Sequence, residues 1–257
     1  MEFWNSGTAE FWRKRTIRLK SAMPFLLMLI LATGCDRLPG KPNPEDRWKP
    51  ATEVTDFSRL YAGNCSGCHG ADGRLGAARP LNDPLYLALA SPPAIRAVIA
   101  RGVPGTSAPP FAQPAGGNLT DKQIDILVDG MMSRWGKAEN FSNGALPPYS
   151  LQDAVATGSG PGATERGAAA FQTYCAQCHG TDGNGGPKGR WVIDAAYLAL
   201  TSDQALRTAV IVGRSDLGKP DWRANIPGRP MTAQEISDVV AWLASHRQAG
   251  SIASKSK

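Results

Sequence analysis

The stretch Cys65-Ser-Gly-Cys68-His69-Gly70 recurs 110 residues later as Cys175-Ala-Gln-Cys178-His179-Gly180. In the pattern C-x-x-C-H, two thiols three residues apart can each form a thioether to one haem, and the adjacent histidine can ligate the iron. One copy is a moderately specific signal, and two copies that each precede a glycine-rich loop are a strong one. The sequence therefore predicts two covalently attached haem c groups, held by Cys65, Cys68 and His69 and by Cys175, Cys178 and His179.

Three other uses of paired cysteines compete with haem. A thioredoxin-like redox motif needs no adjoining histidine, and it lies beside a βαβ pattern that we do not find. Zinc could be held by the four cysteines, but Cys175 follows Cys68 by 107 positions, which exceeds finger or ribbon spacing. A zinc site would also leave both histidines unexplained. Simple disulfides remain open for an exported chain.

The charge of the chain gives no argument for a nucleic-acid partner. The formal net charge is +6, but five basic residues lie within the first 35 residues. The rest is nearly balanced, and haem propionates would make it more negative. We find no basic stripe and expect no nucleic-acid binding. The 28 glycines and 20 prolines suit loop-rich domains whose core is completed by a large apolar cofactor.

Residues 1–35 have the features of a signal peptide. Basic residues precede a ten-residue apolar run at 23–32, which is too short to span a bilayer comfortably. Cys35 follows small residues, as in a bacterial lipoprotein signal, although Ala32 stands where leucine is usual. We expect lipidation of Cys35; ordinary signal cleavage or an uncleaved anchor are the alternatives.

The segment that follows has the composition of a tether. Residues 36–54 are polar and rich in proline, which would give the chain reach from a membrane. We therefore expect a protein on the periplasmic face of the bacterial inner membrane, anchored by lipid. A soluble periplasmic protein is the alternative.

The chain also repeats itself outside the cysteine motifs. Tyr86-Leu-Ala-Leu matches Tyr197-Leu-Ala-Leu, and Leu119-Thr120 matches Met231-Thr232. Self-similarity at a nearly fixed offset indicates two copies of one structural unit. We expect a first repeat at 55–137, a linker at 138–163, a second repeat at 164–247 and a tail at 248–257.

Helical signals dominate both repeats, and strand signals are nearly absent. In each repeat a helix leads into the motif, a middle helix follows at 93–101 or 203–212, and a last helix opens at Thr120 or Thr232. The last helices carry matching apolar stripes, formed by Ile124, Leu127, Val128 and Met131 and by Ile236, Val239, Val240 and Leu243. The predicted fold is all-α, with two tandem domains of a few helices around a covalently bound haem.

Both repeats resemble class I cytochrome c domains. The shared features are an N-terminal helix that ends in C-x-x-C-H, a glycine-rich proximal loop, a middle helix, a distal loop and a C-terminal helix. The resemblance implies a dihaem periplasmic electron carrier. It also implies a distal methionine ligand in the loop before the last helix, commonly just ahead of a proline.

Neither repeat has that methionine. Ala108 and Lys219 occupy the position, 39 and 40 residues after their histidines. Alanine has no ligating atom, so haem 1 is predicted to be open or to take a ligand from elsewhere, with Met131 and Met132 as candidates. A lysine loses its proton more readily when buried against haem, so Lys219 is the predicted distal ligand of haem 2, and Met231 is a weaker candidate.

Other residues are expected around the haems. The resemblance also implies that the Pro80 carbonyl accepts a hydrogen bond from His69. The corresponding position of the second repeat falls near Arg190 and Trp191, where the resemblance does not fix the equivalent bond. His246 is expected at the end of the last helix, where a cation is favourable. Candidates for covering the haem edges or binding propionates are Arg79, Arg101, Arg190, Arg214 and Trp222.

The sequence predicts electron transfer between respiratory or photosynthetic redox partners, including other redox proteins or a membrane electron-transport complex. Haem supplies the redox chemistry, and the protein supplies orientation, burial and axial ligation. An open haem 1 leaves two alternatives: a dihaem enzyme of the peroxidase or sulfur-compound-oxidising kind, or a gas-binding sensor. We find no distinct catalytic residue near Ala108, which favours the carrier over an enzyme.

Overall fold

The structure, a computed structural model, describes residues 43–44, 47–141, 144–153 and 162–247. Both repeats belong to one compact unit, which begins at Ala51. The predicted signal peptide, Cys35 and the tail at 248–257 lie outside the described residues. Among the described residues, no helix has the length and apolar character needed to cross a membrane.

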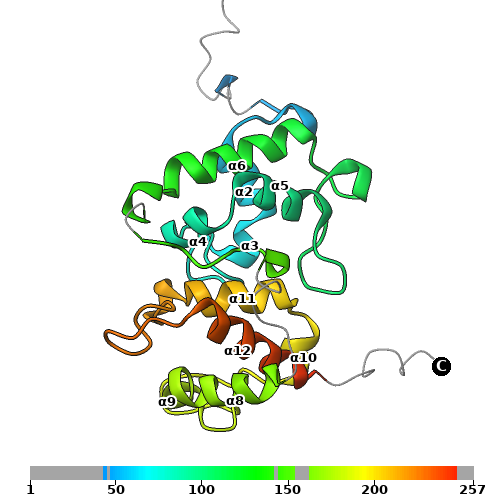
Figure 1. The fold of residues 1–257 in the computed structure, drawn as a ribbon. Helices are drawn as coiled ribbons and strands as arrows, with labels where there is room; N and C mark the ends of the chain where they lie inside the picture. The colour runs from blue at the N-terminus through cyan, green and yellow to red at the C-terminus, as the bar shows by residue number, and fades with distance from the viewer. Residues whose placement is uncertain (1–42, 45–46, 142–143, 154–161, 248–257) are drawn as a thin grey trace, which may run out of the picture. The chain divides into compact units, whose positions relative to one another are not determined.

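The regular elements of the described residues are all helical, which confirms the predicted fold class (Figure 1). Strand pairing there is limited to two isolated bridges. The first repeat contains α2 (Phe57–Asn64), α3 (Ser66–His69), α4 (Pro84–Leu89), α5 (Pro92–Arg101), η3 (Gln113–Ala115) and α6 (Asp121–Trp135), between η2 (Ala51–Glu53) and η4 (Ala138–Phe141). The second repeat contains α8 (Ala163–Tyr174), α9 (Ala176–His179), α10 (Ala195–Ala199), α11 (Asp203–Val212), η5 (Ser215–Leu217) and α12 (Ala233–Ser245).

The last helix of each repeat, α6 or α12, begins with a capping box. Thr120 and Thr232 each form a capping box, in which the threonine hydroxyl accepts from the backbone of Gln123 or Glu235 and that side chain accepts in return. A capping box satisfies two backbone donors that a helix start would otherwise leave unpaired. This explains why both helices start where the sequence predicts.

Two short helices were missed by the sequence analysis. The first matching Tyr-Leu-Ala-Leu segment lies within α4, and the second lies in α10 up to its C-cap, Leu200. Asp83 and Asp194 cap these helices by accepting backbone hydrogen bonds. The signal was present, because aspartate is a favoured N-cap residue and Pro84 is well suited to the first helical position.

Where the first and last helices of a repeat cross, one helix contributes a large side chain and the other a glycine. The glycine lies on the last helix in the first repeat and on the first helix in the second repeat. In the first repeat, Gly130 of α6 faces Phe57 of α2, and a Cβ at Gly130 would lie 2.1 Å from the ring. In the second repeat, Gly167 of α8 faces Trp242 of α12, and a Cβ there would lie 2.7 Å from the Trp242 Cβ and 2.0 Å from the Asp238 carbonyl oxygen. Alignment of the repeats pairs Phe57 with Gly167 and Gly130 with Trp242, so the two partners are exchanged.

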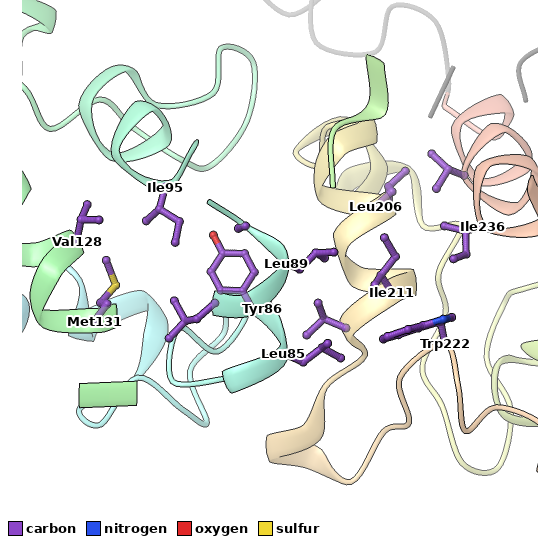
Figure 2. Packing of buried hydrophobic residues seen from close by; sticks show 14 of the residues in the cluster. Leu85, Tyr86, Leu89, Ile95, Val128, Met131, Leu206, Ile211, Trp222 and Ile236 are labelled. Carbon is purple, nitrogen blue, oxygen red and sulfur yellow. The ribbon is translucent and has the colours of Figure 1, made fainter. Parts of the chain in front are cut away.

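Buried apolar side chains of both repeats form one cluster. Figure 2 shows Leu85 and Leu89 of α4 on the side that faces α11, which carries Leu206 and Ile211. Helices α4 and α11 are neighbours, so the cores of the two repeats meet there.

Residues 148–151 of the linker are bound to α11 of the second repeat. Gln204 of α11 donates to the Tyr149 carbonyl at 2.8 Å and accepts from the Leu151 backbone at 2.9 Å. Arg207, which is fully buried, donates to the Pro148 carbonyl from Nε at 2.9 Å and from Nη2 at 2.8 Å. Burial lowers the pKa of Arg207, and these carbonyl contacts hold its charge in the interior.

Candidate haem-binding sites

Each cysteine motif forms one helical turn directly after a longer helix. Cys65 ends α2 and Cys175 ends α8, and the short helices α3 and α9 follow. The His69 backbone donates to the Cys65 carbonyl at 3.0 Å, and His179 donates to Cys175 at the same distance. Both thiols and the histidine of each motif therefore lie on one helical turn, as attachment of one haem requires.

A glycine closes each turn in a conformation that disfavours other residues. Gly70 has φ +84° and Gly180 has φ +80°. A Cβ at Gly70 would lie 1.8 Å from the Arg74 carbonyl oxygen, and one at Gly180 would lie 2.5 Å from that of Gly185. Because only glycine is unstrained here, the chain can fold back tightly beneath each histidine.

Both histidine rings are oriented by a backbone carbonyl. His69 Nδ1 lies 2.7 Å from the Arg79 oxygen, and His179 Nδ1 lies 2.6 Å from the Arg190 oxygen. Burial lowers the pKa of His69, which favours its neutral form. A neutral ring that donates from Nδ1 has its lone pair on Nε2, the nitrogen that would ligate iron.

The carbonyl partner of His69 corrects the sequence analysis by one residue. The prediction that Pro80 accepts this hydrogen bond is wrong, since the acceptor is Arg79. The position near Arg190 does supply the equivalent acceptor in the second repeat. Loop geometry decides which of two neighbouring carbonyls faces the ring, and residue type does not reveal it.

The first cysteine of each motif has a raised pKa. Burial, with the neighbouring cysteine as a second cause, raises the pKa of Cys65 to about 11 and that of Cys175 to about 12. All four cysteines are free, and within the described ranges no group of three or more His, Cys, Asp or Glu could share a metal ion. The two pairs therefore do not form the single zinc site considered above, whereas each motif with its oriented histidine fits a haem.

The distal loop of the first repeat offers no ligand at Ala108. The Val103 backbone donates to the Ala108 carbonyl at 2.9 Å. Gly102, with φ +63°, packs so closely that a Cβ would lie 2.5 Å from the same oxygen. The loop is thus closed by backbone contacts, with a methyl group at the predicted ligand position.

In the second repeat, Lys219 lies beside the proximal segment of its own domain. Its backbone donates to the Arg214 carbonyl at 2.9 Å, and its ammonium donates to the Lys188 carbonyl. An amine that ligates iron must first lose a proton and release this carbonyl. Lys219 ligation stays a prediction.

The methionine candidates lie in the core. Met131 is 1% exposed within the stripe of α6, and Met231 is 3% exposed. The Met231 sulfur accepts from the Asn225 amide at 3.7 Å. Met132 of α6 is half-buried and packs against the same core.

The remaining predicted residues have varied surroundings. His246 caps the end of α12 and its Nδ1 lies 2.8 Å from the Trp242 carbonyl oxygen, at the helix end as expected. Trp222 is buried. Arg101 is exposed at the end of α5. The guanidinium groups of Arg79 and Arg214 bind backbone oxygens of the opposite repeat, a use that the sequence did not reveal.

Comparison with known proteins identifies both repeats. Residues 164–247 match the family described as Cytochrome c, and residues 52–129 match the family described as Cytochrome C oxidase, cbb3-type, subunit III. No curated protein matches the chain. A solved structure similar to this chain is that of the Kuenenia stuttgartiensis reducing HAO-like protein complex Kustc0457/Kustc0458. It has 16% sequence identity and a TM-score of 0.46, over 79% of this chain and all of the other.

The helical fold, the two motifs and the two family matches define two cytochrome c domains in one chain. The protein is a dihaem c-type cytochrome, and its domains imply covalently bound haem c.

Proposed function

We propose that this protein is an extracytoplasmic electron carrier that passes electrons between redox partners through its two haems. The observation that carries the proposal is the repeated arrangement of C-x-x-C-H with a histidine Nδ1 held by a backbone carbonyl. The family description matched by the first repeat names an oxidase subunit. By analogy, we infer that one partner is a membrane electron-transport complex of respiration or photosynthesis.

The protein's own residues have separate tasks in this function. Cys65, Cys68, Cys175 and Cys178 would hold the two haems, and His69 and His179 would ligate the irons. Bound haem supplies one-electron cycling between Fe(III) and Fe(II). The carbonyls of Arg79 and Arg190 fix the two rings and increase their basicity, which would lower the reduction potentials of the bound haems.

Membrane attachment is part of the proposal. Cys35 would carry the lipid anchor, and residues 36–54 would let the domains reach partners at the periplasmic face of the inner membrane. The signal-like segment at 1–35 supports this location, as does the presence of cytochrome c domains.

The predicted distal ligands imply different spin states for the two haem irons. Fully oxidised wild-type protein should contain one high-spin haem, at the site with Ala108, and one low-spin haem ligated by Lys219. Ala108→Met should make both haems low-spin by supplying a thioether, and Lys219→Ala should make both high-spin. Quantitative electron paramagnetic resonance of the holoprotein measures these fractions. Two low-spin haems in the wild type would contradict the open site, and an unchanged spectrum in Lys219→Ala would contradict lysine ligation.

A second candidate function rests on Ala108 alone. An open haem 1 would permit peroxidase-like chemistry, oxidation of a sulfur compound, or binding of CO or NO. Assay of the holoprotein with peroxide and with thiosulfate separates these uses from electron transfer. The carrier predicts reversible oxidation and reduction without catalytic turnover, whereas sustained turnover would favour an enzyme. Ligand binding without turnover would favour a sensor.

A further inference from the structure

A loop from each repeat meets the other at the boundary between the two domains. Proximal loop 1 comprises residues 70–83, between α3 and α4, and distal loop 2 comprises residues 213–220, which include η5. Three hydrogen bonds join them: Leu75 N–H to Asp216 Oδ2 at 3.0 Å, Arg214 Nη2 to the Gly76 oxygen at 3.1 Å, and Ser215 Oγ to Asp83 Oδ2 at 2.6 Å.

The two carboxylates in this contact are buried and have fixed partners. The Asp216 side chain is 0% exposed and is bound by Arg214 through Nε and Nη2, both at 2.9 Å. Asp83 is 2% exposed, and its other oxygen caps α4. Buried carboxylates that lose a partner are strongly destabilised, so these contacts hold the loops in one arrangement, unlike an exposed ion pair.

The backbone of proximal loop 1 also depends on the contact. Leu75 has φ +62°, a conformation that leucine rarely adopts, and its N–H is the donor to Asp216. Non-glycine residues persist in this region only where surrounding structure holds them. Distal loop 2 therefore supports a strained turn in the other repeat.

That turn lies against the motif that contains His69, the predicted proximal ligand of haem 1. Gly76, which accepts from Arg214, lies against the motif, since a Cβ there would be 2.3 Å from the Cys68 oxygen. Arg79 makes two further hydrogen bonds, one to the ligand and one to the other repeat. Its carbonyl accepts from His69 Nδ1 at 2.7 Å, and its guanidinium donates to the Ala205 oxygen of α11 at 2.9 Å.

We propose that Arg79 and the Arg214–Asp216 pair are positioning residues through which the second domain holds His69 in its ligating orientation. The proposal rests on the proposed function only in requiring two redox-active haems. It implies that the reduction potential of haem 1 depends on residues of the domain that binds haem 2. Weakening the contact should loosen the Nδ1 hydrogen bond, lower the basicity of the ring and favour Fe(II) at haem 1.

The test compares variants on opposite sides of the contact. Arg79→Gln keeps the backbone carbonyl but removes the guanidinium, and Asp216→Asn removes the charge bound by Arg214. Spectroelectrochemical titration of the holoprotein should show the same one of two steps moved to higher potential in both variants. The expected change in its equilibrium constant is about tenfold, which equals about 59 mV for one electron.

One control variant and one milder test variant complete the experiment. Arg96→Gln breaks an exposed ion pair with Asp121 and Asp125 inside the first repeat and should move neither step. Ser215→Ala deletes a single hydroxyl at the contact and should move the same step. It takes the place of Asp216→Asn if that variant does not fold.

The outcomes separate this proposal from the proposed function. Two reversible steps in the wild type that stay unmoved in the contact variants, or different steps moved by Arg79→Gln and Asp216→Asn, would overturn the positioning role and leave the electron carrier intact. A wild type without two reversible steps would overturn both.

Discussion

A chain in which Cys65 and Cys68 are both replaced by alanine is expected to carry one covalent haem in place of two. Each motif is a complete turn of its own repeat, with its own histidine and its own carbonyl acceptor. Removal of one thiol pair therefore leaves the other site chemically whole. Intact mass and the pyridine haemochrome content per chain both measure this stoichiometry.

The matched controls use the remaining cysteines. Replacement of Cys175 and Cys178 should likewise leave one haem, and Cys35→Ala should leave two, because Cys35 lies outside both motifs. Retention of two covalent haems by either pair variant would contradict assignment of that motif. Loss of both haems from one pair variant would contradict independent sites.

The exchanged residues at the helix crossings predict a second large effect, on stability. Trp242→Gly should lower the free energy of unfolding by about 3–5 kcal/mol, because a buried aromatic ring leaves a cavity. Gly167→Phe should be destabilising by about 1–3 kcal/mol or more, because the Asp238 carbonyl lies 2.0 Å from a Cβ placed there. The double variant reproduces the order in the first repeat, Phe57 against Gly130. It should recover about 0.5–1 kcal/mol relative to the sum of the two singles, because it relieves the approach to the Trp242 Cβ at 2.7 Å but leaves the Asp238 backbone in place.

Denaturant unfolding of the holoproteins, followed by circular dichroism, gives these differences. The reciprocal cycle in the first repeat, Phe57→Gly with Gly130→Trp, is the matched test and should show coupling of the same sign. Additive losses in both cycles would contradict the view that the large and small residues compensate each other across the crossing.

The sequence predicts the local features of the sites because they are local in the chain. The C-x-x-C-H turn, the glycine after it and the capped last helix each depend on residues within a few positions of one another. The apolar stripe of α6 and its copy in α12 are also visible as periodicity, and they place Ile124 and Ile236 in the core, both fully buried. These features were sufficient for the fold class, and the predicted haem-binding residues depend on the same local pattern.

The features that the sequence did not predict depend on loops and on distant pairs. The acceptor for His69 was misplaced by one residue because the path of proximal loop 1 decides it. The bond between Ser215 and Asp83 joins residues 132 positions apart, and no periodicity marks it. The exchange of Phe57 and Gly130 for Gly167 and Trp242 could have been found by aligning the repeats, but each glycine alone looks like an ordinary weak helix residue.

Coulometric titration of the purified holoprotein tests the central claim most directly. A dihaem electron carrier should take up two electrons per chain from a reductant and return both to an oxidant, with the same optical changes in each direction. Uptake of one electron or none would contradict two redox-active haems, and failure to return the electrons would contradict a carrier.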